Sequence, residues 1–268
     1  MIESIADLGL VEDEDISLGN AALRLAALDH PGVDIAASEA VIERLADEVA
    51  AASARTDTTV RRAAALRTIL ADKHDYRGDS DTYDADVNAD LISVLDRRRG
   101  LPVALAILYV AIARRLGWTA DVLNTPGHIV ITLGDEGDRV VLDPFNGGRQ
   151  LTPEGLQEVI KRATGSWQSL DPSGWVPMEN RAVLVRLVNN LAVRALGAGA
   201  LDRAALLYER LTTIAPTVAE FWWERAKIER RLRHNGKARA CLSALMETTT
   251  DPTMRREIRR MLDDIPHA

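Results

Sequence analysis

The first ninety residues carry apolar side chains at the spacing of amphipathic helices. One such run covers residues 21–28 and stops at a Pro-Gly pair. A second helix is predicted over 38–54, with Ser38 as the N-cap residue that bonds free backbone N–H groups of the first turn. A third helix is expected to follow a cap at Thr56 or Asp57.

Residues 72–90 are polar and rich in aspartate, which predicts a loop. The helix expected after it, over 101–116, is the most apolar in the chain. Pro102 suits its first turn, where the missing N–H leaves no bond unmade, and Gly117 suits the position just past its end. Its middle is apolar on all sides except for the hydroxyl of Tyr109, and such a helix belongs in the centre of a domain.

Beyond this helix the apolar positions alternate with a period of two, which indicates strands. A short strand is predicted over 119–123. Residues 128–133 and 139–143 are predicted to form a hairpin around the Gly-Asp-Glu-Gly turn at 134–137.

A symmetric register about that turn predicts which hairpin residues face one another. The expected opposite pairs are His128 with Asp143, Val130 with Val141, and Thr132 with Arg139. The other face is wholly apolar and consists of Ile129, Ile131, Leu133, Val140 and Leu142. One face is therefore expected to be core, while the other presents a histidine directly across from an aspartate.

The last third of the chain is predicted to be helical from Asn180 and to contain a degenerate 34-residue repeat. Its signature positions are Ala204, Tyr208 and Pro216, followed by Ala238 and Leu242 in the second copy. Gly199 falls at the turn between two helices, and Trp222 occupies an expected bulky position, although Thr250 replaces the second proline. This spacing is typical of a tetratricopeptide repeat.

A boundary is expected at the Asp-Pro-Ser-Gly segment 171–174, which divides the chain into residues 1–175 and 176–268. Residues 252–265 are predicted to form a capping helix.

Composition narrows the function classes. The formal net charge of −7 provides no basic field for nucleic acid or anionic lipid, so neither is an expected partner. No stretch approaches the roughly 20 apolar residues that a membrane span needs, and the amino terminus has no signal-peptide pattern. Cys241 is the single cysteine, so no internal disulfide forms. A cytoplasmic protein is expected.

His128 and Asp143 form two-thirds of a nucleophile–base–orienter triad. In a cysteine enzyme the thiol would lie at the amino end of a buried helix, where the helix dipole lowers its pKa. The chain provides that helix at Pro102, but residues 100–104 contain no Cys, Ser or Thr.

Several motifs in a fixed order carry a family resemblance. They are Tyr76-Arg77-Gly78, Tyr83, Arg97-Arg98-Arg99-Gly100-Leu101-Pro102, Leu105, Tyr109, Ala113-Arg114-Arg115-Leu116-Gly117, Pro126-Gly127-His128 and Asp143-Pro144-Phe145-Asn146-Gly147-Gly148. Together they resemble the SirB1 family, a bacterial branch of the transglutaminase-like superfamily. The resemblance is close over residues 75–155 and loose in the tail.

The resemblance implies an α+β fold: a transglutaminase-like core with a buried central helix and a small antiparallel sheet, followed by C-terminal helical repeats. Aligning Gly100 and Gly117 with the glycines that flank the superfamily's cysteine helix places Pro102 at the nucleophile position. His128 and Asp143 then match the superfamily's histidine and aspartate. The family keeps proline at this position, so it implies no thiol chemistry.

Several of these features also have purely structural interpretations. His128 and Asp143 can simply stabilise a hairpin by their hydrogen bond. The arginine run 97–99 could dock an anion before a helix, but pairing with the acidic loop is favoured. That loop lacks the ordered spacing and closing glutamate of a calcium-binding EF-hand. Cys241 is expected to be a small buried hydrophobe. Trp222 and Trp223 follow one another in a predicted helix, so one ring is expected to point inward and the other outward.

The leading hypothesis is a pseudoenzyme: a non-catalytic or catalytically altered transglutaminase-like protein that binds protein or peptide partners through its helical repeats, without a cofactor or metal. Candidate binding residues are Arg99, Tyr109, Asn146 and Trp222. The alternative is a hydrolase of peptide or amide bonds in which His128 and Asp143, alone or together with a metal ion, activate water without a cysteine nucleophile. A third possibility is a pure scaffold, in which His128→Ala would change stability but not binding.

Overall fold

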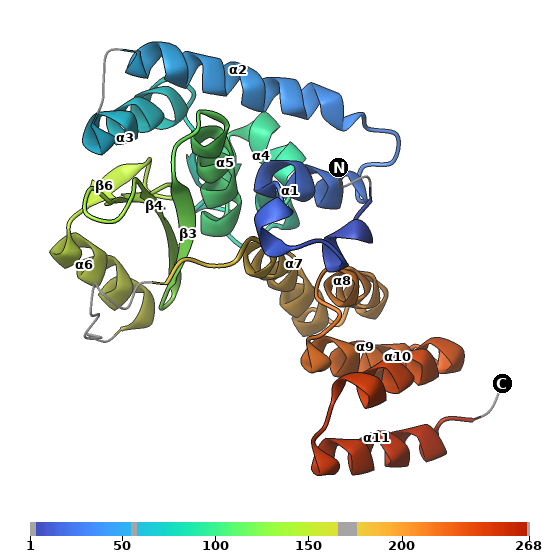
Figure 1. The fold of residues 1–268 in the computed structure, drawn as a ribbon. Coiled ribbons are helices and arrows are strands. Elements are labelled where there is room, and N and C mark those ends of the chain that lie inside the picture. Colours follow the sequence, from blue (N-terminus) through green and yellow to red (C-terminus); the bar gives the residue numbers. More distant parts are fainter. Residues whose placement is uncertain (1–3, 55–57, 166–175, 267–268) are drawn as a thin grey trace. The chain divides into compact units, whose positions relative to one another are not determined.

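The fold is α+β, and contacts divide the chain into two compact units, each described separately below (Figure 1). The computed structural model describes residues 4–54, 58–165 and 176–266. The first unit, here called the core unit, contains residues 13–183. The second, here called the tail unit, combines residues 184–266 with residues 4–12, which the sequence-based division had grouped with the core.

The core unit contains the sheet and most of the helices. The helices are α1 (Leu18–Ala27), α2 (Ile35–Ser53), α3 (Thr59–Arg67), the π-helix η3 (Thr68–Lys73), α4 (Leu91–Arg97), α5 (Pro102–Arg115), α6 (Pro153–Thr164) and the start of α7 (Asn180–Gly197), with short 3-10 turns η2 (Asp13–Asp15) and η4 (Asp86–Asn88). The strands are β1 (Arg77–Gly78), β2 (Arg99–Gly100), β3 (Ala120–Thr125), β4 (His128–Leu133), β5 (Val140–Asp143) and β6 (Arg149–Leu151).

Helix α5 is the most deeply buried element of the core unit. Every residue from Pro102 to Val110 is buried, as are Ile112 and Ala113. Helices α1, α2 and α4 contact it, and so do strands β3 and β4. A helix without a polar face can be stable in this position because neighbours cover all its sides.

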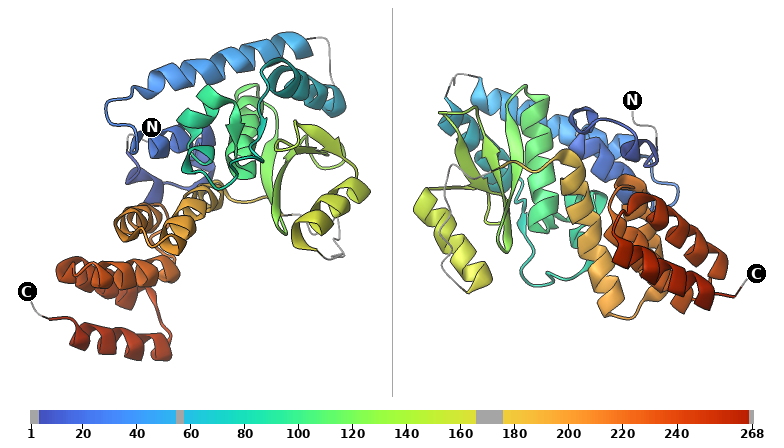
Figure 2. Two further views of the ribbon diagram at one scale, coloured as in Figure 1. Left: turned by 180° about the vertical axis from the view of Figure 1, so that it is seen from behind. Right: turned by 60° about the horizontal axis from the view of Figure 1, so that its bottom comes forward.

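Strands β3 to β6 form an antiparallel sheet in chain order, and the sheet lies between α5 and α6 (Figures 1 and 2). The α6 side holds an apolar cluster of Leu123, Val130, Val141, Leu151, Leu156 and Ile160. The hairpin's second face is therefore also covered, by a helix that the pattern analysis did not identify. The separate strands β1 and β2 pair in parallel.

The predicted hairpin register is wrong by two residues. Thr132, and not Val130, pairs with Val141, and Leu133 pairs with Val140. Because the shift is an even number, each side chain stays on the expected face of the sheet. His128 pairs instead with Thr125 of β3 across the turn at Gly127. Asp143 is therefore a diagonal neighbour of His128 and does not lie directly across from it.

Two of the predicted helix starts need correction. Helix α2 begins before Ser38, because the Asp34 carboxylate accepts the Ala36 N–H at 2.9 Å and acts as N-cap. Thr56 and Asp57 lie outside the described residues, and the N-cap position of α3 is Thr58. The predicted boundary at 171–174 also lies outside the described residues.

The tail unit consists of helices joined by short turns. After the end of α7 come α8 (Leu201–Ile214), α9 (Ala219–Arg231), α10 (Asn235–Thr248) and α11 (Pro252–Asp264), and the 3-10 turn η1 (Asp7–Gly9) contacts α8. Gly199 adopts φ +71° between α7 and α8, at the predicted turn. Each of α8 to α10 contacts the next helix along the chain.

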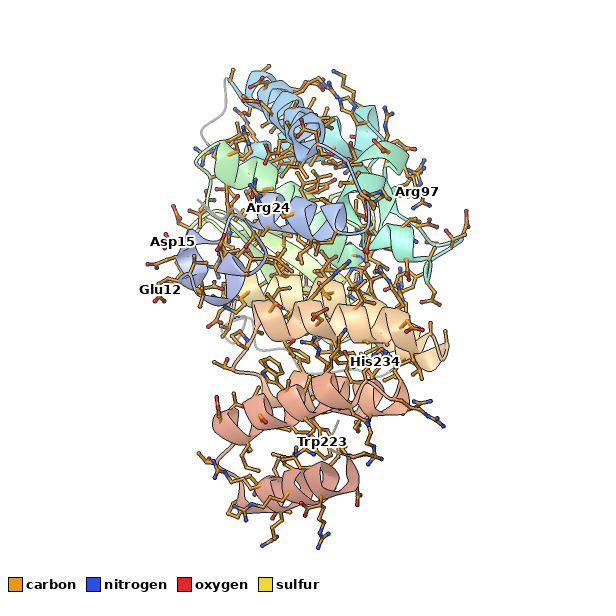
Figure 3. All side chains as sticks on the ribbon, turned by 90° about the vertical axis from the view of Figure 1, so that its right-hand side faces the viewer. Glu12, Asp15, Arg24, Arg97, Trp223 and His234 are labelled. Atoms are coloured by element: carbon orange, nitrogen blue, oxygen red, sulfur yellow. The ribbon has the colours of Figure 1, made fainter. Side chains whose placement is uncertain are left out.

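A second apolar cluster fills the space between α9, α10 and α11. Its buried members are Ala226, Ala238, Cys241, Leu242, Leu245, Ile258 and Ile265. Trp222 and Trp223 are both partly buried against it, so the expectation that one ring points outward is wrong (Figure 3 labels Trp223). In the part of the chain that the structure describes, no helix is long and apolar enough to cross a bilayer.

Candidate functional site

His128 is placed by a tight turn between β3 and β4. Gly127 adopts φ +72°, and a Cβ there would lie 2.7 Å from the side chain of Ala163 in α6. A larger residue would be strained at this backbone angle and would also push α6 away, so the position requires glycine. The Thr125 hydroxyl donates to the His128 carbonyl at 3.0 Å and closes the turn. The first residue of β4 is therefore held firmly in place.

Asp143, the last residue of β5, is fully buried and accepts hydrogen bonds from two residues. Its Oδ1 lies 3.0 Å from Nε2 of His128. The Asn146 side-chain amide donates to Oδ2 at 2.6 Å, and the Asn146 backbone N–H donates to Oδ1 at 3.2 Å. The sequence thus predicted correctly that these residues are neighbours, although not their pairing in the sheet.

The environment keeps Asp143 ionised. Burial raises the pKa of this carboxyl, but the hydrogen bond and charge of His128 and the two Asn146 bonds outweigh it, and the pKa is lowered. A carboxylate only accepts hydrogen bonds, so Nε2 of His128 must carry the proton. In the neutral ring Nδ1 is then the basic nitrogen, and within the described residues it makes no hydrogen bond.

His128, Phe145 and Tyr83 form a chain of edge-on ring contacts. The rings of His128 and Phe145 meet edge-on with centroids 6.1 Å apart, and those of Phe145 and Tyr83 do so at 5.9 Å. Phe145 is half-buried and Tyr83 is exposed. A Cβ on Gly78 of β1 would lie 2.4 Å from the Phe145 ring, so this ring also fixes the loop that approaches β1.

Pro102, which the family resemblance assigns to the nucleophile position, is buried in the first turn of α5. Proline has no side-chain atom that can attack a carbonyl carbon. The single cysteine, Cys241, belongs to the tail unit and is 2% exposed, and burial raises the pKa of its thiol. The core unit therefore contains a hydrogen-bonded histidine–carboxylate pair, whereas the thiol of Cys241 is buried in the tail unit, where little thiolate forms.

The predicted binding residues have different surroundings. Asn146 is exposed and bonded to Asp143, so it belongs to the candidate site. Arg99 donates to the backbone carbonyl of Asp75 at 2.6 Å and to its carboxylate at 2.7 Å. Trp222 lies in the tail unit and donates from its indole to the Pro216 carbonyl at 2.7 Å. Arg99 and Asn146 therefore belong to the core unit and Trp222 to the tail unit, and each bonds a different partner.

Tyr109 of α5 is fully buried, and its hydroxyl makes no hydrogen bond within the described residues. A Cβ on Gly148 would lie 2.7 Å from this hydroxyl, so the turn after Asp143 rests directly on it. Burial raises the pKa of Tyr109 well above its usual value, and the charges of Asp72 and Asp143 raise it further. The tyrosine is therefore a support beneath the site.

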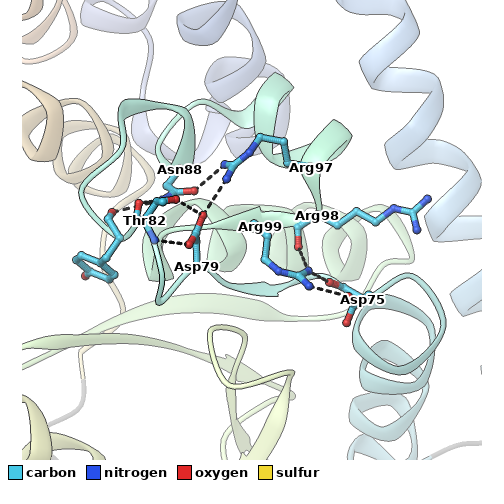
Figure 4. A network of polar contacts seen from close by, with 8 residues as sticks. Asp75, Asp79, Thr82, Asn88, Arg97, Arg98 and Arg99 are labelled. Atoms are coloured by element: carbon cyan, nitrogen blue, oxygen red, sulfur yellow. Dashed lines mark hydrogen bonds and ion pairs between the residues drawn. The ribbon is translucent and has the colours of Figure 1, made fainter.

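The arginine run 97–99 pairs with the acidic loop before it, as the structural interpretation expected. Arg97 bonds the Asp79 carboxylate and the Asn88 amide oxygen, each at 2.8 Å (Figure 4). The Asp79 carboxylate also accepts the backbone N–H and hydroxyl of Thr82, each at 2.8 Å. The pKa of Asp79 is lowered, first by these Thr82 bonds and then by Arg97, against the effect of burial.

The sequence predicted that the arginine run pairs with the loop but not which residues bond, because the bonded residues lie up to 18 positions apart without a periodic pattern. Within the described residues, no group of three or more His, Cys, Asp or Glu side chains is arranged to hold a metal ion.

Comparisons with known proteins agree with this architecture. A family model described as Transglutaminase-like superfamily matches residues 36–189, which is more than half of the chain. A UPF0162 protein of Xylella fastidiosa (strain 9a5c) is 29% identical over 248 residues, covering 90% of this chain and 86% of that protein. A UPF0162 protein of Pseudomonas aeruginosa is 26% identical over 260 residues, covering 97% and 95%.

A shorter similarity extends to eukaryotes. The human protein named F-box only protein 21 is 30% identical over 135 residues, which cover 47% of this chain and 20% of the human protein. The family match, together with the buried helix and the histidine–aspartate pair, defines the class of protein. The chain belongs to the transglutaminase-like superfamily.

Proposed function

We propose that this protein is a transglutaminase-like protein of the SirB1 type that has no thiol chemistry and binds a protein or peptide partner. One observation carries the proposal. Pro102 begins the buried helix where the superfamily's nucleophile is expected, while His128 and Asp143 keep a 3.0 Å hydrogen bond. The framework of a catalytic site is thus present without the atom that would form a covalent intermediate.

The tail helices supply the proposed binding surface. Ala204 and Ala238, 34 positions apart, are both 0% exposed, and Tyr208 and Leu242 are buried at the corresponding next turn. This equivalence supports the interpretation as a tetratricopeptide-like repeat. Stacked helical repeats commonly present extended surfaces to other proteins.

The binding proposal is tested by affinity capture with the full chain and a matched pair of surface variants. Leu206 in the tail unit is 41% exposed, and Leu28 in the core unit is 46% exposed. A partner captured by the wild type is expected to be lost with Leu206→Asp and kept with Leu28→Asp. A partner that both variants retain, or that only Leu28→Asp loses, would contradict binding through the tail.

A hydrolase is the second candidate, and the unbonded Nδ1 of His128 favours it, because this nitrogen could accept a proton from water. Purified protein is assayed with peptide, amide and ester substrates. The pseudoenzyme proposal expects no turnover above buffer. Turnover that disappears in His128→Ala and persists in Cys241→Ala would establish a hydrolase without a cysteine nucleophile.

A metal-dependent version of that hydrolase is tested separately by elemental analysis of the purified protein. Stoichiometric transition metal that is lost in His128→Ala would support it, and metal retained by that variant would assign the ion to another part of the chain.

A further inference from the structure

A small hollow of about 240 Å³ lies beside the turn that follows Asp143. Its walls come from η3 and the end of α3, from β1 and the loop before it, and from the turn between β5 and β6. Its lining includes Arg67, Asp72, Asp75, Arg77, Asn146 and Gly147. Pockets for drug-sized ligands measure roughly 300–1,000 Å³, so this hollow fits one small group.

Positive charge predominates around the hollow. Arg67, Arg77 and Arg149 line it together with Asp72 and Asp75. Asp75 is bonded by the guanidinium groups of both Arg77 and Arg99, and these bonds, that of Arg99 first, lower the pKa of its carboxyl. The protein as a whole has a net charge of −7, so three arginines against two aspartates at this hollow are opposite in sign to the charge of the chain.

Two donors at the hollow have bonding capacity left. The Nε atom of Arg67 lies 3.8 Å from Asp72, which is at the limit of an ion pair, and both side chains are more than half exposed. The backbone N–H of Gly147 makes no hydrogen bond within the described residues. The backbone amides on both sides of Gly147 donate to Asp143, so the N–H of Gly147 is the amide of this turn that remains available to a ligand.

The hollow is connected to the histidine–aspartate pair through Asn146. This residue lines the hollow and also donates its side-chain amide to Asp143 at 2.6 Å. Beneath the same turn, the unbonded and fully buried hydroxyl of Tyr109 contacts Gly148. A ligand that pulled on the Asn146–Gly148 turn would therefore act directly on the bonds that hold Asp143.

We propose that this hollow binds a carboxylate group of the peptide partner, with the Arg67 guanidinium and the Gly147 N–H as its donors. The inference deepens the proposed function and rests on it. Arginine and backbone N–H groups are well suited to carboxylates because charge-assisted bonds to them are short and strong. The size of the hollow admits one such group, which would anchor a chain passing beside His128.

In the test, each probe is titrated into the isotope-labelled full chain, and binding is measured from the NMR signal of the Gly147 amide. Three probes are used: acetyl-Ala-Ala-Ala with a free carboxyl terminus, the same peptide as its amide, and acetyl-Ala-Glu-Ala amide with an internal acid. Inorganic phosphate is a fourth probe. The first and third probes distinguish a terminal carboxylate from a side-chain carboxylate.

The expected result is a saturable shift of the Gly147 signal with at least one carboxylate peptide and none with the uncharged amide. Arg67→Gln should weaken that binding about three- to tenfold, because one partly exposed charge-assisted bond is lost. Arg115→Gln is the matched control: Arg115 is 48% exposed, has a comparable loose ion pair with Glu43 at 3.3 Å, and lies at the end of α5 outside the hollow.

Four results would each overturn the assignment of the hollow. Two are comparisons: equal shifts with the acid and the amide, and equal weakening of binding by the two arginine variants. The other two are a shift with phosphate alone and no shift with any probe. None of these results bears on a partner captured through Leu206 of the tail unit, so a failure of the hollow can be told apart from a failure of the proposed function.

Discussion

Nε2 of His128 lies 3.0 Å from Oδ1 of Asp143 although the two residues are diagonal neighbours in the sheet. Continuing the observed register places Val130 opposite Asp143, two residues beyond His128. Diagonal side chains can meet in an antiparallel sheet when one of them is long. The imidazole reaches forward along β4, toward the position opposite Asp143, and Asn146 holds the carboxylate from the other side.

Asn146→Ala is expected to destabilise the protein in a pH-dependent way. The pKa of Asp143 is lowered in the folded state, so its carboxylate contributes stability above its unfolded pKa of about 3.9, and that stability is lost as the pH falls through the lower folded pKa. Removing the Asn146 amide raises the folded pKa. The free energy of unfolding should fall by about 1–2 kcal/mol at neutral pH, and the difference should shrink in acid.

The measurement is urea unfolding at several pH values. Asn190→Ala is the control, because the Asn190 amide bonds the Arg186 carbonyl at 2.9 Å and involves no carboxylate. A loss that is the same at every pH for Asn146→Ala would contradict the coupling to Asp143.

The sequence predicted which face each hairpin residue occupies, but it did not predict the register. Alternation determines the face, whereas the register depends on the loop between the strands. That loop is held by contacts from distant residues: the Thr59 hydroxyl of α3 bonds Asp138 at 2.5 Å, and the Gly134 N–H bonds the Thr119 carbonyl at 2.8 Å. Such contacts leave no periodic signal in a sequence.

Helix α6 was missed although local signals for it exist. Thr152 accepts the Gly155 N–H at 3.1 Å as N-cap, Pro153 occupies the first turn, and Gly165 ends the helix at φ +73°. The nearness of His128 and Asp143 was predicted because both residues belong to contiguous motifs. The hollow was not predicted, because its walls come from two distant stretches of the chain, residues 67–77 and 146–149, that only the fold brings together.

Gly148→Ala is expected to cost about 1–3 kcal/mol, because a non-glycine residue at φ +66° is strained and the new methyl group would collide with the Tyr109 hydroxyl. Tyr109→Phe alone should be neutral or stabilising, since the hydroxyl is buried without a partner among the described residues. The double variant should lose less than the sum of the single changes. Thermal unfolding measures all three, and strict additivity would show that the collision is not the cause.

Cys241 should react slowly with iodoacetamide in the native protein and fully after unfolding. The thiol is 2% exposed, and burial raises its pKa, so little thiolate is available. Mass spectrometry of the modified chain follows the reaction. Rapid stoichiometric labelling of the folded protein at neutral pH would show that this cysteine is accessible, and thiol chemistry would have to be reconsidered.

The ion pair between Asp79 and Arg97 should show a measurable coupling in a double-mutant cycle. Asp79 is nearly buried and its partner only partly exposed, and Arg97 also bonds Asn88, so the geometry is constrained from both sides (Figure 4). Fully exposed pairs contribute roughly 0–1 kcal/mol, whereas removing one partner of a buried pair costs several. The Asp79→Asn and Arg97→Gln cycle should therefore give a coupling of about 1 kcal/mol or more.

The Arg115–Glu43 pair, with side chains 48% and 60% exposed, provides the matched cycle. Its coupling should be near zero because water screens both charges. Urea unfolding of both sets of variants gives the two couplings. If they are equal, the Asp79–Arg97 bond contributes no more than a surface contact.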